Sequence, residues 1–294
     1  MSGSGRRVLV TGARGRVGAE LVPALVGVGW EVLDTDLHDL DVRDREAVLA
    51  AIKVLEPDLV FNLAAETDVE QAEIDEPAAT LVNAGAVGHL REAAEQVGSR
   101  LVHLSTDYVF GGHQRVPYTE RAVPDPLSAY GRSKAAGEVL ADGPDSVVVR
   151  TAWLSGRHGR CAARTIVEQA RDPQRPLVYV ADQVGTPTAI PDLVAILLDV
   201  AESGAPPLVH VTNAGSGSWF DLAQHVLAVL DEDPDRVRPV ATSELVPPPI
   251  AKRPEYSVLG DEAGRAGGLR ALDDWHDAID RLVRGYVAES GWRR

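Results

Sequence analysis

Residues 8–18 read Val-Leu-Val-Thr-Gly-Ala-Arg-Gly-Arg-Val-Gly, and this stretch decides the fold. Its apolar beginning, Val8 to Val10, predicts a short buried strand, and the apolar residues from Arg16 to Val28 recur at helical spacing. The glycines between them follow the pattern G-x-x-G-x-x-G. A strand that turns through such glycines into a helix is typical of the first βα unit of a dinucleotide-binding domain.

Each glycine of this loop has its own predicted role. Gly12 makes the tight turn out of the strand, Gly15 lets the backbone approach a pyrophosphate, and Gly18 allows the helix to pack closely on the strand. The helix that follows presents unpaired backbone N–H groups and a partial positive charge to the phosphates. The loop therefore predicts a dinucleotide site.

The end of the second predicted strand bears on the choice of dinucleotide. Asp36, or alternatively Asp34, can accept hydrogen bonds from the adenosine ribose and repel a 2′-phosphate, which favours NAD over NADP. Arg14 and Arg16 indicate the opposite, because either guanidinium could pair with a 2′-phosphate. The sequence predicts NADH or NADPH without choosing between them. The dipeptide Asp41-Val42 resembles a stretch that commonly flanks the adenine, and a solvated turn is an equally good interpretation.

Short apolar runs and helical stretches alternate through the first half of the chain. Strands are predicted at 8–10, 31–33, 58–62, 100–105 and 146–150, and helices at 16–28, 44–55, 77–97 and 128–140. These strands are apolar without alternation, as burial on both faces of a parallel sheet requires. We therefore expect an α/β fold with a Rossmann-type doubly wound parallel sheet.

The pattern loosens after about residue 155. Helices are predicted at 161–169, 191–201 and 219–230, and a strand at 208–211 could return to the main sheet. We expect a dinucleotide-binding domain over 1–155, completed by part of 177–215, and a smaller, irregular substrate lobe mainly over 156–294.

The composition excludes several classes of protein. The chain has 44 acidic and 29 basic side chains, a net charge of −15, so nucleic acid and anionic membranes are poor partners for it. The single cysteine, Cys161, excludes an internal disulfide and fits a reducing compartment. No apolar segment approaches the roughly 20 residues of a membrane span, and the N-terminus has no apolar signal-peptide region. We expect a cytoplasmic protein.

Tyr130 and Lys134 form the pattern Y-x-x-x-K on a predicted helix, and Thr106 follows the fourth strand. Residues four apart share a helix face, so the phenol and the ammonium can enter one site. A carbonyl that receives a hydride needs a proton, and a nearby ammonium lowers the phenol pKa from its usual value near 10. Lys134 can also bind the nicotinamide ribose, and Thr106 can orient the substrate oxygen. With six tyrosines and three lysines, chance would give this pattern only about 0.06 times.

These motifs resemble those of the extended short-chain dehydrogenase/reductases, and within them the dTDP-4-dehydrorhamnose reductase family. The stretches that carry the resemblance are Val10-Thr-Gly-Ala-Arg-Gly-Arg-Val-Gly18, Pro57-Asp-Leu-Val-Phe-Asn-Leu-Ala-Ala65, Leu104-Ser-Thr-Asp-Tyr-Val-Phe110, Tyr130-Gly-Arg-Ser-Lys-Ala-Ala-Gly-Glu138, Arg150-Thr-Ala-Trp153, Asp182-Gln-Val-Gly-Thr-Pro-Thr188 and Arg253-Pro254. They are spread over most of the chain. The runs that begin at Ser105 and Asp182 are fairly specific to this family.

The resemblance implies a reaction and a set of site residues. The reaction is reduction of the C4 ketone of a nucleotide-linked 4-keto-6-deoxyhexose by NADPH or NADH, with Tyr130 as proton donor and with Lys134 and Thr106 completing the catalytic group. Asp107 and Trp153 are implied at the substrate. The residues implied along the cofactor are Gly15, Arg16, Val17, Ala64, Ala65, Glu66 and Thr67. Some members of the family bind Mg²⁺ at a dimer interface. A homodimer and bound Mg²⁺ are therefore implied by the resemblance alone.

Two departures from the family pattern bear on the sugar. Glu66 stands where the family often has His or Tyr, and Tyr256 precedes Ser257 where Asn is usual. Either change would reshape the sugar pocket. Arg253 can grip the nucleotide diphosphate bidentately, and a surface ion pair is an equally good interpretation.

Two other functions remain alternatives. An epimerase or dehydratase of the same superfamily would hold NAD tightly and return the hydride, but a dehydratase usually has Glu where Tyr108 follows Asp107. A non-catalytic regulatory subunit resembling methionine adenosyltransferase subunit beta would not need an intact Tyr130 and Lys134.

Several remaining residues are interpreted as structural. The histidines show no metal-binding spacing, and His103 in the fourth strand is interpreted as a buried, hydrogen-bonded imidazole. Cys161 is interpreted as a buried thiol. Ser218 is predicted to cap a helix, and Trp219 after it to belong to the core.

Overall fold

The structure of the protein, a computed structural model, describes residues 5–290. Its centre is a six-stranded sheet in which all neighbouring strands are parallel. The strands are β1 (Arg7–Thr11), β2 (Glu31–Thr35), β3 (Leu59–Asn62), β4 (Arg100–Thr106), β5 (Ser146–Thr151) and β10 (Leu208–His210). Their spatial order is β10-β5-β4-β3-β1-β2. The order reverses between β1 and β3, and open parallel sheets bind ligands at such a switch point, outside the carboxyl ends of the strands.

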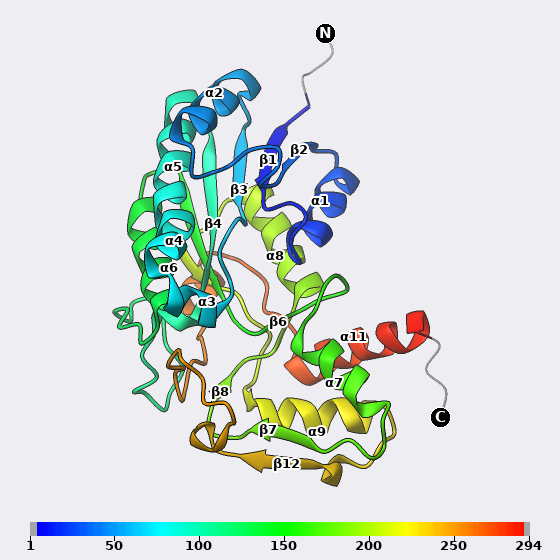
Figure 1. The fold of residues 1–294 in the computed structure, drawn as a ribbon. Helices are drawn as coiled ribbons and strands as arrows, with labels where there is room; N and C mark the ends of the chain where they lie inside the picture. Colours follow the sequence, from blue (N-terminus) through cyan, green and yellow to red (C-terminus); the bar gives the residue numbers. More distant parts are fainter. Residues whose placement is uncertain (1–4, 291–294) are drawn as a thin grey trace.

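Helices cover both faces of this sheet, as Figure 1 shows. One face carries α1 (Gly18–Gly27) and α8 (Ile190–Ser203), and the other carries α2 (Arg45–Leu55), α5 (Ala86–Val97) and α6 (Ala129–Ala141). The inner strands β1, β3, β4 and β5 are buried on both sides, which accounts for the predicted absence of polar alternation, whereas the edge strand β2 is partly exposed. The predicted doubly wound parallel sheet is confirmed.

The segment before α5 is less regular than predicted. The expected helix over 77–97 consists of α4 (Glu76–Thr80), a π-helical turn (Leu81–Gly85) and α5, and a short α3 (Val69–Ile74) precedes it. Asp68 and Asp75 cap α3 and α4 through their carboxylates, and this starts each helix anew.

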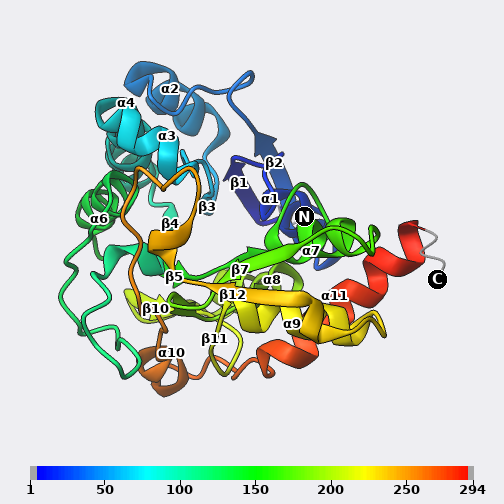
Figure 2. The ribbon, with the colours of Figure 1, turned by 60° about the horizontal axis from the view of Figure 1, so that its bottom comes forward.

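The second half of the chain adds a smaller lobe below the sheet (Figures 1 and 2). Its core lies between α7 (Ala162–Ala170), α9 (Trp219–Val229) and α11 (Trp275–Ser290). Strand β7 (Leu177–Val180) pairs in parallel with β12 (Val237–Val240) beside α9. Two-residue strands complete the lobe: β6 (Leu154–Ser155) with β9 (Thr188–Ala189), and β8 (Val184–Gly185) with β11 (Gly217–Ser218). Short helical turns lie at Asp107–Val109, Pro234–Arg236, Thr242–Glu244 and Glu262–Ala266.

The sequence analysis predicted α7, α8, α9 and β10, but not α11. The buried side chains of α11 include Ala278, Ile279, Leu282, Val283 and Tyr286, whose helical spacing would have predicted it. The predicted domain limits stay predictions. Within residues 5–290, no helix combines the length and the apolar character needed to cross a bilayer.

Candidate active site

A cavity of about 690 Å³ lies at the carboxyl ends of β1, β3 and β4. The second lobe contributes Leu154, Ala162 and Trp219 to its wall. Most residues that the sequence nominated line this cavity: Gly12, Gly15, Arg16, Val17, Gly18, Asp36, Asp41, Val42, Ala64, Ala65, Glu66, Thr67, Thr106, Asp107, Tyr130, Lys134 and Trp153. Arg14 and Arg253 do not line it.

The glycine loop has the shape that a diphosphate requires. Gly12 has a φ of +66°, and a Cβ on it would lie 2.8 Å from the backbone nitrogen of Ala64. A Cβ on Gly18 would lie 2.5 Å from the carbonyl oxygen of Ala13, so only glycine lets α1 start this close to β1. Backbone and helix N-terminus therefore border the cavity without side chains between them. These residues fit a dinucleotide.

The adenosine end of the cavity carries both charge signs. The Asp36 carboxylate accepts hydrogen bonds from the backbone N–H groups of Arg14 (3.0 Å) and Leu37 (2.8 Å). The Arg14 guanidinium is turned to Asp39, 2.8 Å away. Arg43, which the sequence analysis did not single out, lines the cavity and pairs with Asp41 at 2.7 Å. The sequence feature that could have identified Arg43 is its position directly after Asp41-Val42, the dipeptide that resembles an adenine-flanking stretch.

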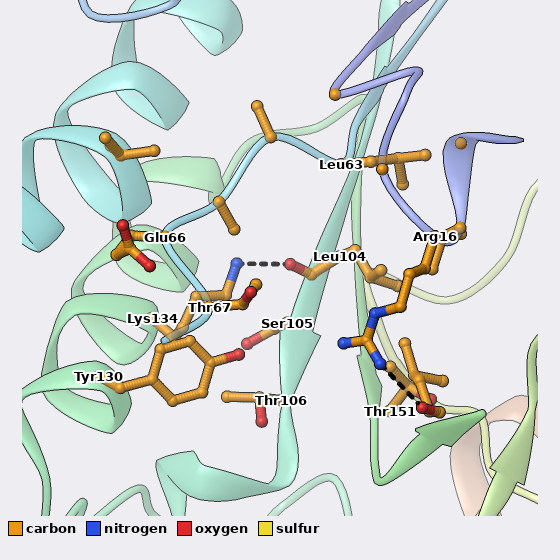
Figure 3. Close-up of a pocket in the computed structure, with 18 of the residues that line it drawn as sticks. Arg16, Leu63, Glu66, Thr67, Leu104, Ser105, Thr106, Tyr130, Lys134 and Thr151 are labelled. Atoms are coloured by element: carbon orange, nitrogen blue, oxygen red, sulfur yellow. Dashed lines mark hydrogen bonds between the residues drawn. The ribbon is translucent and has the colours of Figure 1, made fainter. Parts of the chain in front are cut away.

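Arg16 lies elsewhere in the cavity, at the end occupied by Tyr130. Its guanidinium donates a hydrogen bond to the Leu154 carbonyl oxygen (3.1 Å) and faces Tyr130 and Lys134 across the cavity (Figure 3). Its charge also lowers the pKa of Tyr130, which requires proximity. Arg16 therefore bridges the glycine loop and the second lobe rather than the adenosine end.

Strand β4 and helix α6 bring the three predicted catalytic residues together. The Ser128 hydroxyl caps α6 by accepting from the Gly131 N–H (3.2 Å), and a Cβ on Gly131 would lie 2.2 Å from the Tyr108 carbonyl oxygen. The helix therefore packs against the turn that follows β4. Lys134 is buried, and its ammonium donates to the Leu104 carbonyl oxygen at 2.6 Å (Figure 3). The Thr106 hydroxyl donates to Asp107 (3.0 Å).

Burial controls the protonation of this group. It raises the pKa of Tyr130 to about 12, and Asp107 raises it further while the Thr106 hydroxyl lowers it. Burial also lowers the pKa of Lys134 to about 8, against the opposing effect of Glu138. The expectation that Lys134 lowers the phenol pKa is not met here, because desolvation of the phenolate dominates. Tyr130 is thus protonated at neutral pH and able to donate a proton.

Asp107 is a buried carboxyl. It accepts hydrogen bonds from Ser257 (2.5 Å) and Thr106 (3.0 Å). Burial nevertheless raises its pKa to about 7. Its charge state therefore changes near neutral pH, beside the proposed proton donor.

Asp107→Asn is expected to raise Tm more at pH 8 than at pH 4. The pKa of Asp107 in the folded protein lies above its pKa in the unfolded chain. Between about pH 4 and pH 7 the folded protein therefore keeps this proton while the unfolded chain releases it, so the free energy of unfolding falls as pH rises. Asparagine removes this dependence. Calorimetry of both proteins at the two pH values, with Asp39→Asn as an exposed control, measures it. An equal Tm change at both pH values would contradict the assigned shift.

Two tryptophans form a flat aromatic wall. The rings of Trp153 and Trp219 stack at 3.6 Å with 4° between their planes, and both line the cavity. The Trp219 indole N–H donates to Gln183 (3.1 Å), which fixes its ring. Ser218 caps α9 as predicted, and Trp219 packs against the core of the second lobe, as interpreted, while its ring also lines the cavity, which the sequence did not indicate.

Two buried polar atoms in the cavity wall lack a hydrogen-bond partner among the described residues. They are the Thr151 hydroxyl and the Trp153 indole nitrogen. Each of these two atoms is itself buried, so its missing hydrogen bond is not replaced by one to solvent and costs free energy. Trp153 also has a φ of +45°, and a Cβ on Gly185 would lie 2.5 Å from its ring. Backbone and packing therefore hold this ring in place.

Of the two departures from the family pattern, only Glu66 faces the cavity. Tyr256 packs against the cluster around Phe110 instead. Arg253 pairs with Glu70 at 2.5 Å and lies beside the Tyr108 hydroxyl at the edge of the site. Cys161 is buried, as interpreted.

Nearly the whole chain is similar to known proteins. The family model described as "RmlD substrate binding domain" matches residues 6–287. A "dTDP-4-keto-6-deoxy-D-glucose reductase" from Streptomyces niveus is 42% identical over 280 residues, covering 93% of this chain and 95% of the relative. A "Probable dTDP-4,6-dihydroxy-2-methyloxan-3-one 4-ketoreductase" from Streptomyces antibioticus is 46% identical over 278 residues, covering 93% of each.

A solved structure is similar along its full length. It is a dTDP-4-dehydrorhamnose reductase from Bacillus anthracis str. Ames in complex with NADP, with a TM-score of 0.91 and 31% identity, covering 96% of this chain and 100% of that one.

Proposed function

The chain belongs to the family described as the RmlD substrate binding domain, and from this premise we propose that it reduces the C4 ketone of a dTDP-linked 4-keto-6-deoxyhexose with NADPH or NADH. The membership confirms the resemblance inferred from the sequence. One observation carries the proposal: Thr106, Tyr130 and Lys134 line the same cavity as the glycine loop. That arrangement serves hydride transfer with proton donation.

The proposed roles follow from the geometry. A bound reduced nicotinamide supplies the hydride. Tyr130 donates its phenol proton to the sugar oxygen, and Thr106 orients that oxygen. Lys134, whose buried side chain lines the cavity, binds the nicotinamide ribose. The wall formed by Trp153 and Trp219 offers a flat apolar face to the substrate.

Oxidation of NADPH and NADH, followed by absorbance, tests this function. The substrates are dTDP-4-keto-6-deoxyglucose, its C5 epimer and a UDP-linked analogue. We expect turnover with at least one dTDP-linked ketone. Purification with tightly bound NAD and no net oxidation would instead support the epimerase or dehydratase. If neither NADPH nor NADH is oxidised and another enzyme co-purifies in a stoichiometric amount, the regulatory subunit would be supported instead.

We propose that the protein accepts both cofactors, because Asp36 offers a carboxylate to the ribose while Arg43 offers a guanidinium to a 2′-phosphate. Arg43→Ala is expected to raise the KM for NADPH about tenfold and the KM for NADH less than about twofold. Arg14→Ala is the matched control, since its guanidinium is turned to Asp39. A larger effect of Arg14→Ala would assign the 2′-phosphate to Arg14 instead.

Assembly and location stay predictions. No group of three or more His, Cys, Asp or Glu side chains within residues 5–290 is placed to hold a metal ion. A Mg²⁺ site at a homodimer interface would therefore draw on side chains from both chains. Sedimentation with Mg²⁺ and with EDTA tests the dimer and its dependence on the ion. A cytoplasmic location is proposed from composition alone.

A further inference from the structure

A line of polar side chains crosses the central sheet beneath the cavity. Thr11, Asn62 and His103 occupy paired register positions on β1, β3 and β4, and each is at most 1% exposed. The Thr11 hydroxyl donates to Oδ1 of Asn62 (2.8 Å), and Nδ2 of Asn62 lies 3.1 Å from Nδ1 of His103. The residues two positions earlier on the same face include Leu9 and Val60, so this line lies in an otherwise apolar layer.

The line ends at the proposed catalytic lysine. Nε2 of His103 lies 3.3 Å from Nζ of Lys134, which also donates to the Leu104 carbonyl oxygen at 2.6 Å. Buried polar groups in an apolar layer are costly unless hydrogen-bonded, so this line is stable only if donors and acceptors match along it.

Matching donors and acceptors fixes the protonation of His103. An ammonium can only donate, so Nε2 must accept from Lys134 and the proton of the neutral imidazole must be on Nδ1. In the structure the Asn62 oxygen accepts from Thr11 and its NH₂ group faces Nδ1, so this protonation requires the Asn62 carboxamide to turn by 180° and present its oxygen to Nδ1. The Thr11 hydroxyl can serve either orientation, because it both donates and accepts.

We propose that His103 is a positioning residue for Lys134: its Nε2 accepts one ammonium hydrogen, Leu104 accepts a second, and the third is left for the cofactor ribose. The tautomer is held through Asn62 and Thr11. This inference rests on the proposed function for its catalytic meaning, but the contact itself can be measured without substrate.

The electrostatic surroundings agree with a neutral imidazole. Burial and the charge of Lys134 hold the pKa of His103 well below its usual value. Glu138, on the same helix, favours the charged lysine. The other charged groups at this end of the cavity act on Tyr130: Asp107 and Glu66 raise its pKa, and Arg16 lowers it.

The first test reads Lys134 directly. The chain has three lysines, so a ¹³Cε-lysine-labelled protein gives three signals, which Lys53→Arg and Lys252→Arg assign by elimination. In His103→Leu the ammonium loses an acceptor, and the Lys134 pKa is expected to fall by about one unit or more below wild type. In His103→Gln the amide oxygen accepts in its place, and the pKa stays within about half a unit of wild type.

The second test reads catalysis. His103→Leu is expected to lower kcat about tenfold near pH 7.5, to move the alkaline limb of the kcat/KM profile to lower pH, and to leave the KM for the sugar nucleotide within about twofold. His103→Gln should restore both kcat and the limb. A merely structural role of His103 would impair both variants alike and leave the limb in place.

The outcomes separate the two proposals. An inactive wild-type protein would overturn the proposed function, while the lysine titration would still decide the inference. A Lys134 pKa that is equal in wild type and His103→Leu would overturn the inference. If His103→Leu does not fold, Asn62→Leu takes its place: it frees the imidazole to put its proton on Nε2, and an unchanged Lys134 pKa there would equally overturn it.

Discussion

Tyr130→Phe is expected to lower kcat about a thousandfold while the Kd for NADPH stays within about threefold. Phenylalanine keeps the ring that packs edge-on against Tyr108, with centroids 5.9 Å apart, and removes only the hydroxyl. Burial holds the phenol protonated at neutral pH, so that hydroxyl can supply the proton in the proposed mechanism. Stopped-flow measurement of NADPH oxidation and fluorescence titration of NADPH give the two numbers.

Tyr256→Phe is the matched control for this variant. It makes the same chemical change outside the cavity, where the ring packs against the cluster around Phe110, so wild-type turnover is expected. Retention of more than about a tenth of wild-type kcat by Tyr130→Phe would refute the role of Tyr130 as proton donor. Loss of NADPH binding in the same variant would mean that the hydroxyl serves the cofactor instead.

Lys134→Met is expected to lower kcat about a hundredfold or more, because it removes the charge that we propose binds the cofactor ribose beside Tyr130. The wild-type rate should itself fall as pH rises through about 8, where Lys134 loses its proton. Lys53→Met and Lys252→Met, at two exposed positions, are controls that should keep full activity. A Lys134→Met enzyme with unchanged kcat and an unchanged alkaline limb would remove Lys134 from the mechanism.

Stability measurements distinguish lost catalysis from lost folding in this variant. Burial lowers the folded pKa of Lys134 below the unfolded value, so the cost of the buried ammonium is fully present below about pH 8 and is relieved as pH rises towards 10.5. The Tm of Lys134→Met minus the Tm of wild type should therefore be more positive at pH 7 than at pH 10. Calorimetry at both pH values checks this sign.

The parts of the site that could be predicted are those with a local physical signature. Glycine is required at position 12 because φ is positive there. At positions 12 and 18 it is also required because the adjacent backbone leaves no space for a Cβ atom. Tyr130 and Lys134 share a helix face at any Y-x-x-x-K, whatever surrounds the helix. The short apolar strands indicated burial on two faces, and the sheet has that arrangement.

The parts that were missed or misjudged depend on what a side chain meets. Trp219 was interpreted as a core residue and does pack on the core of the second lobe, but its ring also stacks on Trp153 at the cavity. Arg14 and Arg43 are equivalent in charge, and only the fold turns one to Asp39 and leaves the other at the cavity. The contact between His103 and Lys134 joins residues 31 positions apart.

By itself, then, the sequence determined the doubly wound sheet, the dinucleotide loop and the catalytic residue types, because periodicity and backbone requirements are local properties. Only the tertiary structure decided which charges face the ligand, that burial rather than Lys134 controls the phenol pKa, and that His103 lies against the lysine. Those properties follow from desolvation and from contacts between distant segments, and these exist only once the chain has folded.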